Sequence, residues 1–142
     1  MAALPRGRAN AQLIEEYLDG GAGNCHLARP EIAELVAQTL RQFDGTRYRL
    51  LAWCIMPNHV HVVFQPRAPF KLEKVMYTWK SYSAQMANLI LKKRGHFWQR
   101  EYYDHLIRDG QQLGRAIRYT TENPMKAGLR DWPWVFVAKD WS

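Results

Sequence analysis

At 142 residues the chain has the length of one ordinary domain and can bury a hydrophobic core. Hydrophobic residues make up 47% of it, with six Trp, seven Tyr and five Phe among them, which excludes an intrinsically disordered protein. The formal net charge of +7 favours a polyanionic partner, although charge alone does not distinguish DNA from RNA or an anionic lipid.

The cysteines and the N-terminal segment indicate the compartment. Cys25 and Cys54 lie far apart and form neither a CxxC pair nor a disulfide framework, which is typical of a protein in a reducing cytoplasm. No apolar run follows the first arginines, as a signal peptide would require, and no stretch approaches the length of a membrane span. We therefore expect a soluble cytoplasmic protein with one domain over residues 1–142.

Two helices are expected in the first third of the chain. Asn10 is a suitable N-cap for a short helix that Gly20 and Gly21 would end. The second helix begins at Pro30, a residue type favoured in the first helical turn, and its apolar residues recur at helical spacing. The apolar face of the first helix would consist of Leu13, Ile14, Tyr17 and Leu18, and that of the second of Ile32, Leu35, Val36, Leu40 and Phe43.

Two strands are expected next. The turn at Asp44-Gly45 leads into RYRLLAWCIM, residues 47–56, whose composition is that of a buried strand. Pro57 and Asn58 interrupt this run, and HVHVVF, residues 59–64, follows as a second strand. The short connection predicts an antiparallel pair.

The second half of the chain adds helices and one further strand. The longest amphipathic helix is expected over about residues 71–93, a strand within 97–108, and a last helix over about 112–122. Pro124 would end this helix or start a new turn, because proline disfavours helical geometry in the residue before it. The tail 131–142 would add a short strand or a loop. The order predicts an α+β domain with an antiparallel sheet and helices on one face.

The sharpest local pattern is the HxH pair at the start of the second strand. Side chains alternate across a strand, so His59 and His61 point to one face and Val60 to the other. Two imidazoles on one face can bind one divalent ion. The alternative is a pair of partly exposed strand histidines without a ligand.

The second pattern is YTTENP in the last helix. Tyr119 and Asn123 are four residues apart and lie on the same side of a helix. The core stripe would contain Leu113, Ile117 and Thr120, with Tyr119 rotated roughly 200° from Ile117 and therefore outside the core. A phenol beside a metal ion can act as a nucleophile, and the Asn123 amide oxygen can complete the metal shell. The alternative is a partly buried tyrosine and a helix-terminal Asn.

Four segments together resemble one known family. MPNHVHVV, WKSYSA, FWQREYYDHLIR and YTTENPMKAGL, in this order and spacing, are similar to the REP-associated tyrosine transposases, which belong to the IS200-like single-tyrosine transposases. REP denotes repetitive extragenic palindromes. The resemblance extends from about Tyr17 to Leu129.

The resemblance implies a fold, a site and a reaction. It implies a ferredoxin-like sheet, an HUH metal motif at His59 and His61, Tyr119 as the nucleophile and Asn123 as the third metal ligand. The expected cofactor is Mg²⁺ or Mn²⁺, which polarises the scissile phosphate. Tyr119 would attack phosphorus and leave a 5′-phosphotyrosine and a free 3′-hydroxyl, a step that a second 3′-hydroxyl can reverse. The expected partner is single-stranded or hairpin DNA bound by a monomer or a dimer.

Other residues of these segments are candidates for DNA contact or for the nucleophile. Tyr102 and Tyr103 compete with Tyr119 as nucleophiles, and the family pattern favours Tyr119. For Trp79 and Trp98 core packing is preferred over base stacking. The expected DNA-binding residues are Lys80, Arg100, Tyr102, Tyr103, His105, Arg108 and Lys126.

The chain departs from the family pattern at two places. Family members begin with a strand, whereas no alternating or β-branched run precedes Asn10, so the first strand is expected to be missing. Thr120 and Thr121 stand where apolar residues usually follow the tyrosine.

Two alternatives to a nuclease stay open. One is a relative that binds DNA or RNA without cutting it. The other is a structural zinc domain that uses Cys54, His59, His61 and His105, although their spacing matches no common zinc framework.

Overall fold

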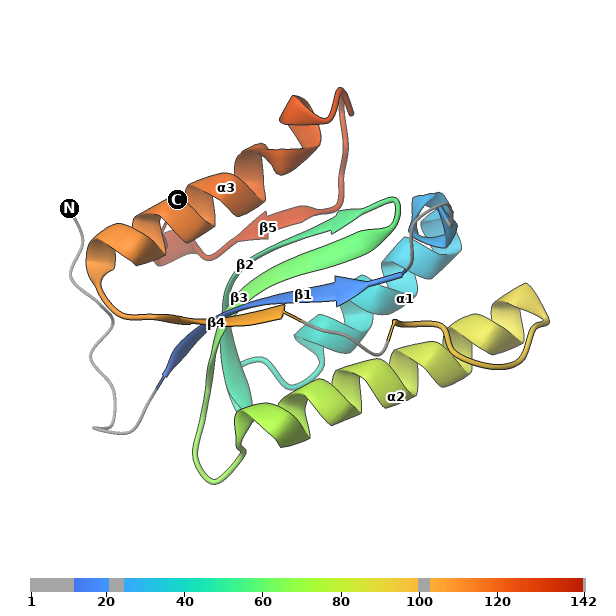
Figure 1. Ribbon diagram of the computed structural model, residues 1–142, viewed down its shortest axis with the longest axis horizontal. Coiled ribbons are helices and arrows are strands. Elements are labelled where there is room, and N and C mark those ends of the chain that lie inside the picture. The colour runs from blue at the N-terminus through green and yellow to red at the C-terminus, as the bar shows by residue number, and fades with distance from the viewer. Residues whose placement is uncertain (1–11, 21–24, 100–102, 142) are drawn as a thin grey trace.

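The computed structural model describes residues 12–20, 25–99 and 103–141. These residues form five strands and three helices, with two short 3-10 helices at His26–Ala28 and Lys139–Trp141 (Figure 1). The strands are β1 (Leu13–Asp19), β2 (Tyr48–Met56), β3 (His59–Pro66), β4 (Tyr103–Ile107) and β5 (Val135–Val137). The helices are α1 (Pro30–Arg41), α2 (Leu72–Leu91) and α3 (Gly110–Lys126). No helix in the described ranges is long and apolar enough to cross a membrane.

The five strands form one antiparallel sheet in the order β4-β1-β3-β2-β5. Its first four strands, together with α1 and α2, follow the βαββαβ sequence of a ferredoxin-like fold, to which α3 and β5 are added at the C-terminal end. The predicted α+β class and the antiparallel pair formed by β2 and β3 are confirmed. Of the two outcomes expected for the tail, a short strand or a loop, the strand is found, because β5 pairs with β2.

The expected helix after Asn10 and the expected absence of a first strand are both wrong. Residues Leu13–Asp19 form β1, which lies in the sheet between β3 and β4. The helical spacing was misleading because both faces of this strand are covered: Leu13 packs on one side, and Ile14 and Leu18 on the other. A strand that is apolar on both faces has no simple alternation, and pairing with two neighbours outweighs local propensity.

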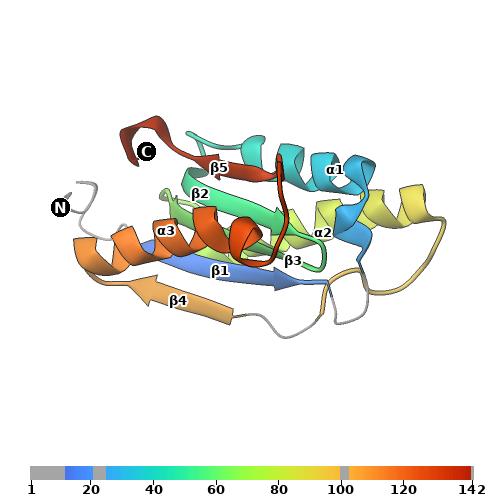
Figure 2. The same cartoon turned by 90° about the horizontal axis from the view of Figure 1, so that it is seen from above.

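The expectation that the helices share one face holds for α1 and α2 but not for α3. Figures 1 and 2 show α3 on the opposite side of the sheet from α1 and α2. The larger hydrophobic cluster joins α1 and α2 to one sheet face through residues such as Leu40, Phe64 and Trp79. The smaller cluster joins the other face to Leu113, Ala116 and Ile117 of α3. The sheet is therefore a middle layer, and the face under α3 carries the site.

The helix α3 does not end before Pro124 but continues to Lys126. Asp109 begins it, because its Oδ1 accepts a hydrogen bond of 2.8 Å from the Gln112 amide. Pro124 is buried, and beyond it the Ala127 amide still donates to the Asn123 carbonyl. Packing of the proline ring outweighs the local preference against helical geometry.

Candidate metal and nucleophile site

Both histidines of the HxH pair lie on the α3 face of β3. His61 is fully buried and His59 half-buried. The ring of Tyr17, from the neighbouring strand β1, stacks on His61 with centroids 4.4 Å apart and lies 5.9 Å from the ring of His59. One aromatic side chain therefore touches both imidazoles, as the alternation along a strand predicts.

Both ring nitrogens of His61 have partners. Its Nε2 lies 2.8 Å from Oε2 of Glu15 on β1, and its Nδ1 lies 2.9 Å from the Thr120 hydroxyl of α3. The Thr120 Oγ1 also lies 2.7 Å from the Ala116 carbonyl oxygen in the preceding helical turn. His61 thus connects the middle of the sheet with the helix above it.

His59 is oriented through one nitrogen. Its Nδ1 lies 3.0 Å from Oδ1 of Asn58, an oxygen that can only accept, so Nδ1 donates and Nε2 holds the lone pair. Burial, and then the neighbouring His61, lower the pKa of His59. Both effects favour the neutral imidazole, which is the form that coordinates a metal ion.

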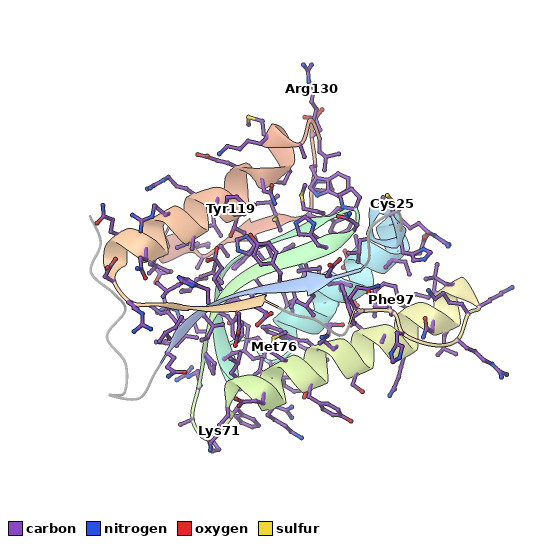
Figure 3. All side chains as sticks on the ribbon, viewed as in Figure 1. Cys25, Lys71, Met76, Phe97, Tyr119 and Arg130 are labelled. Carbon is purple, nitrogen blue, oxygen red and sulfur yellow. The ribbon has the colours of Figure 1, made fainter. Side chains whose placement is uncertain are left out.

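Tyr119 is carried by α3 (Figure 3), and its side chain contacts His61 of this pair. Its ring meets His61 edge-on, with centroids 5.3 Å apart, and 46% of the residue is exposed. Burial, and then a hydrogen bond to Tyr119, raise the pKa of Tyr17. The two phenols are therefore close enough to share a hydrogen bond, in which either hydroxyl can be the donor.

Asn123 lies one turn after Tyr119 and is half-buried. Its Nδ2 is 3.9 Å from Sγ of Cys54, and Cys54 is the cross-strand partner of His61. The structure therefore brings Asn123 to the same part of the sheet face as the histidines. Burial raises the pKa of the Cys54 thiol to about 11. The thiol stays protonated at neutral pH and is a poor metal ligand.

A pocket of about 220 Å³ opens beside Tyr119, between α3 and the β1–β4 edge of the sheet. It is lined by Glu15, His105, Ile107, Gln112, Arg115, Ala116 and Tyr119. Arg115 lies one helical turn before Tyr119, and His105 is the cross-strand partner of Glu15. A larger hollow of about 340 Å³ lies between α1 and Tyr82, on the other side of the sheet from this site.

Within the described ranges, no group of three or more His, Cys, Asp or Glu side chains is arranged to hold a metal ion. The four residues of the zinc alternative are not brought together: His105 lies on β4, and β1 separates β4 from the strand of His59 and His61. The set of two histidines and Asn123 is of a different kind, because its third donor is an amide oxygen.

The expected DNA-binding residues divide into three groups. His105 lines the pocket beside Tyr119, Arg108 follows β4, and Lys126 lies two turns after Tyr119 with an exposed ion pair to Glu122 at 3.6 Å. Lys80 belongs to α2, on the other side of the sheet, where its Nζ donates to the Gln99 carbonyl at 3.4 Å. Arg100, Tyr102 and the Tyr103 side chain lie outside the described residues.

The expectation of core packing for the two tryptophans is confirmed. Trp79 and Trp98 are 2% and 5% exposed and belong to the larger cluster. The Trp98 indole donates to the Ser83 hydroxyl at 2.9 Å. Neither ring is available for stacking on bases.

Four residues of the site were not predicted from the sequence. The sequence pattern assigns Glu15 and Tyr17 to a helix, whereas both lie on β1. It predicts correctly that Thr120 belongs to the core stripe of α3, but it does not predict the contact of Thr120 with His61. Arg115 carried a usable signal, because it lies four residues before Tyr119 and shares its side of the helix.

The chain belongs to the family described as transposase IS200 like, whose model matches residues 26–122. The matched region begins after β1, contains His59, His61 and Tyr119, and ends one residue before Asn123. The resemblance inferred from the motifs is confirmed.

Two curated relatives are REP-associated tyrosine transposases by name. A candidate one from Haemophilus influenzae is 27% identical over 107 residues, and one from Escherichia coli K12 is 24% identical over 97 residues. Each alignment includes 66% of this chain, but the chain spans only 61% and 56% of the lengths of the two relatives.

Two solved structures have the same fold. One is a REP-associated tyrosine transposase bound to a REP hairpin, with a TM-score of 0.68, 17% identity and coverage of 95% of this chain and 82% of that one. The other is a candidate transposase from Deinococcus radiodurans R1, with a TM-score of 0.56, 16% identity and coverage of 82% and 95%.

Proposed function

We propose that the chain cuts and rejoins single strands of hairpin DNA through a covalent bond between Tyr119 and a 5′-phosphate. The observation that carries this proposal is the contact of the half-exposed Tyr119 phenol with an imidazole of the HxH pair. A nucleophile beside a pair of potential metal ligands is the arrangement that phosphoryl transfer needs.

The donor set fits one divalent cation. The residues that would hold it are His59 and His61 through Nε2, and Asn123 through its amide oxygen. The contact of 2.8 Å between Nε2 of His61 and the Glu15 carboxylate requires a proton on one of the two atoms, and a cation bound there would replace this proton. When bound, Mg²⁺ or Mn²⁺ would supply Lewis-acid polarisation of the phosphate.

Tyr119 and Tyr17 have different roles in the proposed cleavage step. The Tyr119 oxygen forms the new bond to phosphorus, the bond from phosphorus to the 3′-oxygen breaks, and the phenolic proton is released while the 3′-oxygen leaves as a hydroxyl. Once Tyr119 loses its proton its oxygen can only accept, so the neighbouring Tyr17 hydroxyl would donate to the phenolate and stabilise it. Attack by a second 3′-hydroxyl reverses the step, so rejoining needs no ATP.

Three features support hairpin DNA as the substrate. A solved structure with the same fold is a REP-associated tyrosine transposase bound to a REP hairpin, which supports this form of DNA as the partner. The pocket beside Tyr119 presents Arg115 and His105, and a guanidinium in this place suits a backbone phosphate. The net charge of +7 fits this partner.

The test is to incubate the chain with labelled hairpin oligonucleotides that carry a single-stranded flank, with and without Mn²⁺. We expect a protein–DNA adduct that survives denaturing electrophoresis, requires the metal and is absent with Tyr119→Phe, while the variant still binds the hairpin. An adduct that persists in this variant and maps to Tyr102 or Tyr103 would show that the nucleophile is a different tyrosine.

A second candidate function is DNA binding without cleavage. It is favoured by the Glu15 carboxylate at Nε2 of His61, which occupies the nitrogen that a metal ion needs. Hairpin binding with no adduct at any Mn²⁺ concentration would select this candidate.

A further inference from the structure

Thr120 is a polar residue in a fully buried position. It lies on the face of α3 that packs against the sheet, and 0% of it is exposed. Its hydroxyl has two partners, the Ala116 carbonyl oxygen at 2.7 Å and Nδ1 of His61 at 2.9 Å. Burying a hydroxyl in an apolar layer is unfavourable unless it is hydrogen-bonded, and an apolar residue would avoid the cost. Packing alone does not explain a hydroxyl at this position, whereas the contact with His61 does.

The number of protons determines the direction of these bonds. The hydroxyl has one proton, and the Ala116 carbonyl can only accept, so a proton donated to it leaves the oxygen lone pairs free. Nδ1 of His61 is then the donor to Thr120, and Nε2 is the nitrogen that shares a proton with Oε2 of Glu15, the proton that a bound cation would replace. Histidines that bind metal ions commonly donate their second N–H to an oxygen in this way.

We propose that Thr120 is a positioning residue that holds the His61 imidazole with Nε2 directed toward the cation. This inference rests on the metal site of the proposed function. Asn58 has the same relation to Nδ1 of His59, so both imidazoles are fixed through Nδ1, and a cation would bind at Nε2, in the case of His61 in place of the proton shared with Glu15. The two supports come from different places, because Asn58 precedes His59 in the chain whereas Thr120 belongs to α3.

The position of Thr120 also gives the contact a consequence for the nucleophile. Thr120 follows Tyr119 directly, so the bond to His61 fixes α3 against β3 at the residue next to the phenol. One hydroxyl therefore sets both the orientation of a metal ligand and the distance between ligand and nucleophile.

The test compares Mn²⁺ binding by the DNA-free protein, measured by electron paramagnetic resonance, in the wild type and three variants. Thr120→Val keeps the shape and removes the oxygen, Thr120→Ser keeps the oxygen, and Thr121→Val removes the neighbouring hydroxyl, which bonds only within α3 to the Arg118 carbonyl at 3.3 Å. We expect Thr120→Val to weaken Mn²⁺ binding about 10- to 100-fold, with Thr120→Ser near the wild type and Thr121→Val unchanged.

The outcomes separate this inference from the proposed function. Tight Mn²⁺ binding by the wild type and equally by Thr120→Val would overturn the role of Thr120 and leave the metal site intact. Loss of binding in both Thr120→Val and Thr120→Ser would indicate a packing role and also overturn it. A wild type that binds no Mn²⁺ would refute the metal site and this inference together.

A second measurement uses the wild type alone, so it does not depend on a variant that folds. Nitrogen NMR of the imidazoles, with Cd²⁺ as a diamagnetic probe, reports which nitrogen binds the metal. We expect the metal on Nε2 of His61 and a proton on Nδ1. Cadmium on Nδ1 would overturn the proposal.

Discussion

The imidazole of His61 and the phenol of Tyr119 meet edge to face, with centroids 5.3 Å apart and planes inclined by 76°. One ring comes from the sheet and the other from a helix that follows it much later in the chain. Their contact depends on α3 lying on the opposite sheet face from α1 and α2. The added helix therefore builds the site, while the ferredoxin-like part supplies the surface beneath it.

Tyr17→Phe removes the hydroxyl that would donate to the Tyr119 phenolate and keeps the ring that stacks on His61. Hydrogen bonds to charged groups contribute about 1.5–3 kcal/mol, so the rate of adduct formation is expected to fall about 10- to 100-fold. Single-turnover kinetics with excess protein measure this rate. Tyr77→Phe, at a position that is 66% exposed on α2, is the matched control. Equal rates for both variants would mean that Tyr17 serves only to pack the histidines.

Replacing either histidine is expected to abolish cleavage, but the two replacements are expected to lower the stability of the protein by different amounts. His59→Ala and His61→Ala each remove a proposed metal ligand, and we expect no adduct from either. His61 is fully buried, with a ring stacked on Tyr17 and two hydrogen bonds, whereas His59 is half-buried with one bond to Asn58. The free energy of unfolding should fall about 1–3 kcal/mol further in His61→Ala. Urea unfolding measures it, and an equal loss in both would contradict the burial of His61.

Arg115 is expected to contact a backbone phosphate in the pocket beside Tyr119. Arg115→Gln should weaken hairpin binding about equally for every DNA sequence. It should also reduce the slope of log affinity against log salt concentration by about 1, because about one fewer counterion is released. Fluorescence anisotropy at several salt concentrations gives both quantities. The control is Arg130→Gln, because Arg130 is exposed beyond the end of α3. If Arg115→Gln leaves the salt dependence unchanged, Arg115 does not contact a backbone phosphate in this pocket.

The sequence predicted the parts of the site that lie on strongly patterned elements. Period-two alternation sufficed to place His59 and His61 on one face, and the helical period placed Tyr119 outside the core stripe. Both inferences need only local geometry. The contact between the two elements did not follow from either pattern, because the side of the sheet that a helix covers depends on the whole topology.

The wrong prediction of a helix at β1 has the same physical origin, because the pairing of this segment is set by the whole topology and not by its local pattern. Leu13, Ile14, Tyr17 and Leu18 recur as on one face of a helix, yet the pattern also suits a strand that both layers cover. Only the pairing with β3 and β4 decides between them, and this pairing joins residues far apart in the chain. Glu15 and Tyr17 were missed for this reason alone.

The same strand predicts an unusual pH dependence of stability, because Glu16 is fully buried. Its side chain lies on the face of the larger core cluster, and its Oε2 has no hydrogen-bond partner among the described residues. Burial, and then the charge of Asp104, raise the pKa of Glu16 from 4.5 to about 8. The folded protein therefore keeps this carboxyl neutral at pH 7.

The sign of the effect follows from proton binding. Between about pH 4.5 and 8 the folded state holds the Glu16 proton and the unfolded state does not, so the free energy of unfolding falls as pH rises through this window. Glu16→Gln stays neutral in both states. The variant should gain stability over the wild type as pH rises, by on the order of a few kcal/mol at pH 8. Thermal and urea unfolding at pH 5, 6.5 and 8 measure the difference, with Glu73→Gln, an exposed position on α2, as the control. A constant difference between wild type and Glu16→Gln across these pH values would mean that the carboxyl is ionised in the folded protein and that β1 does not bury it.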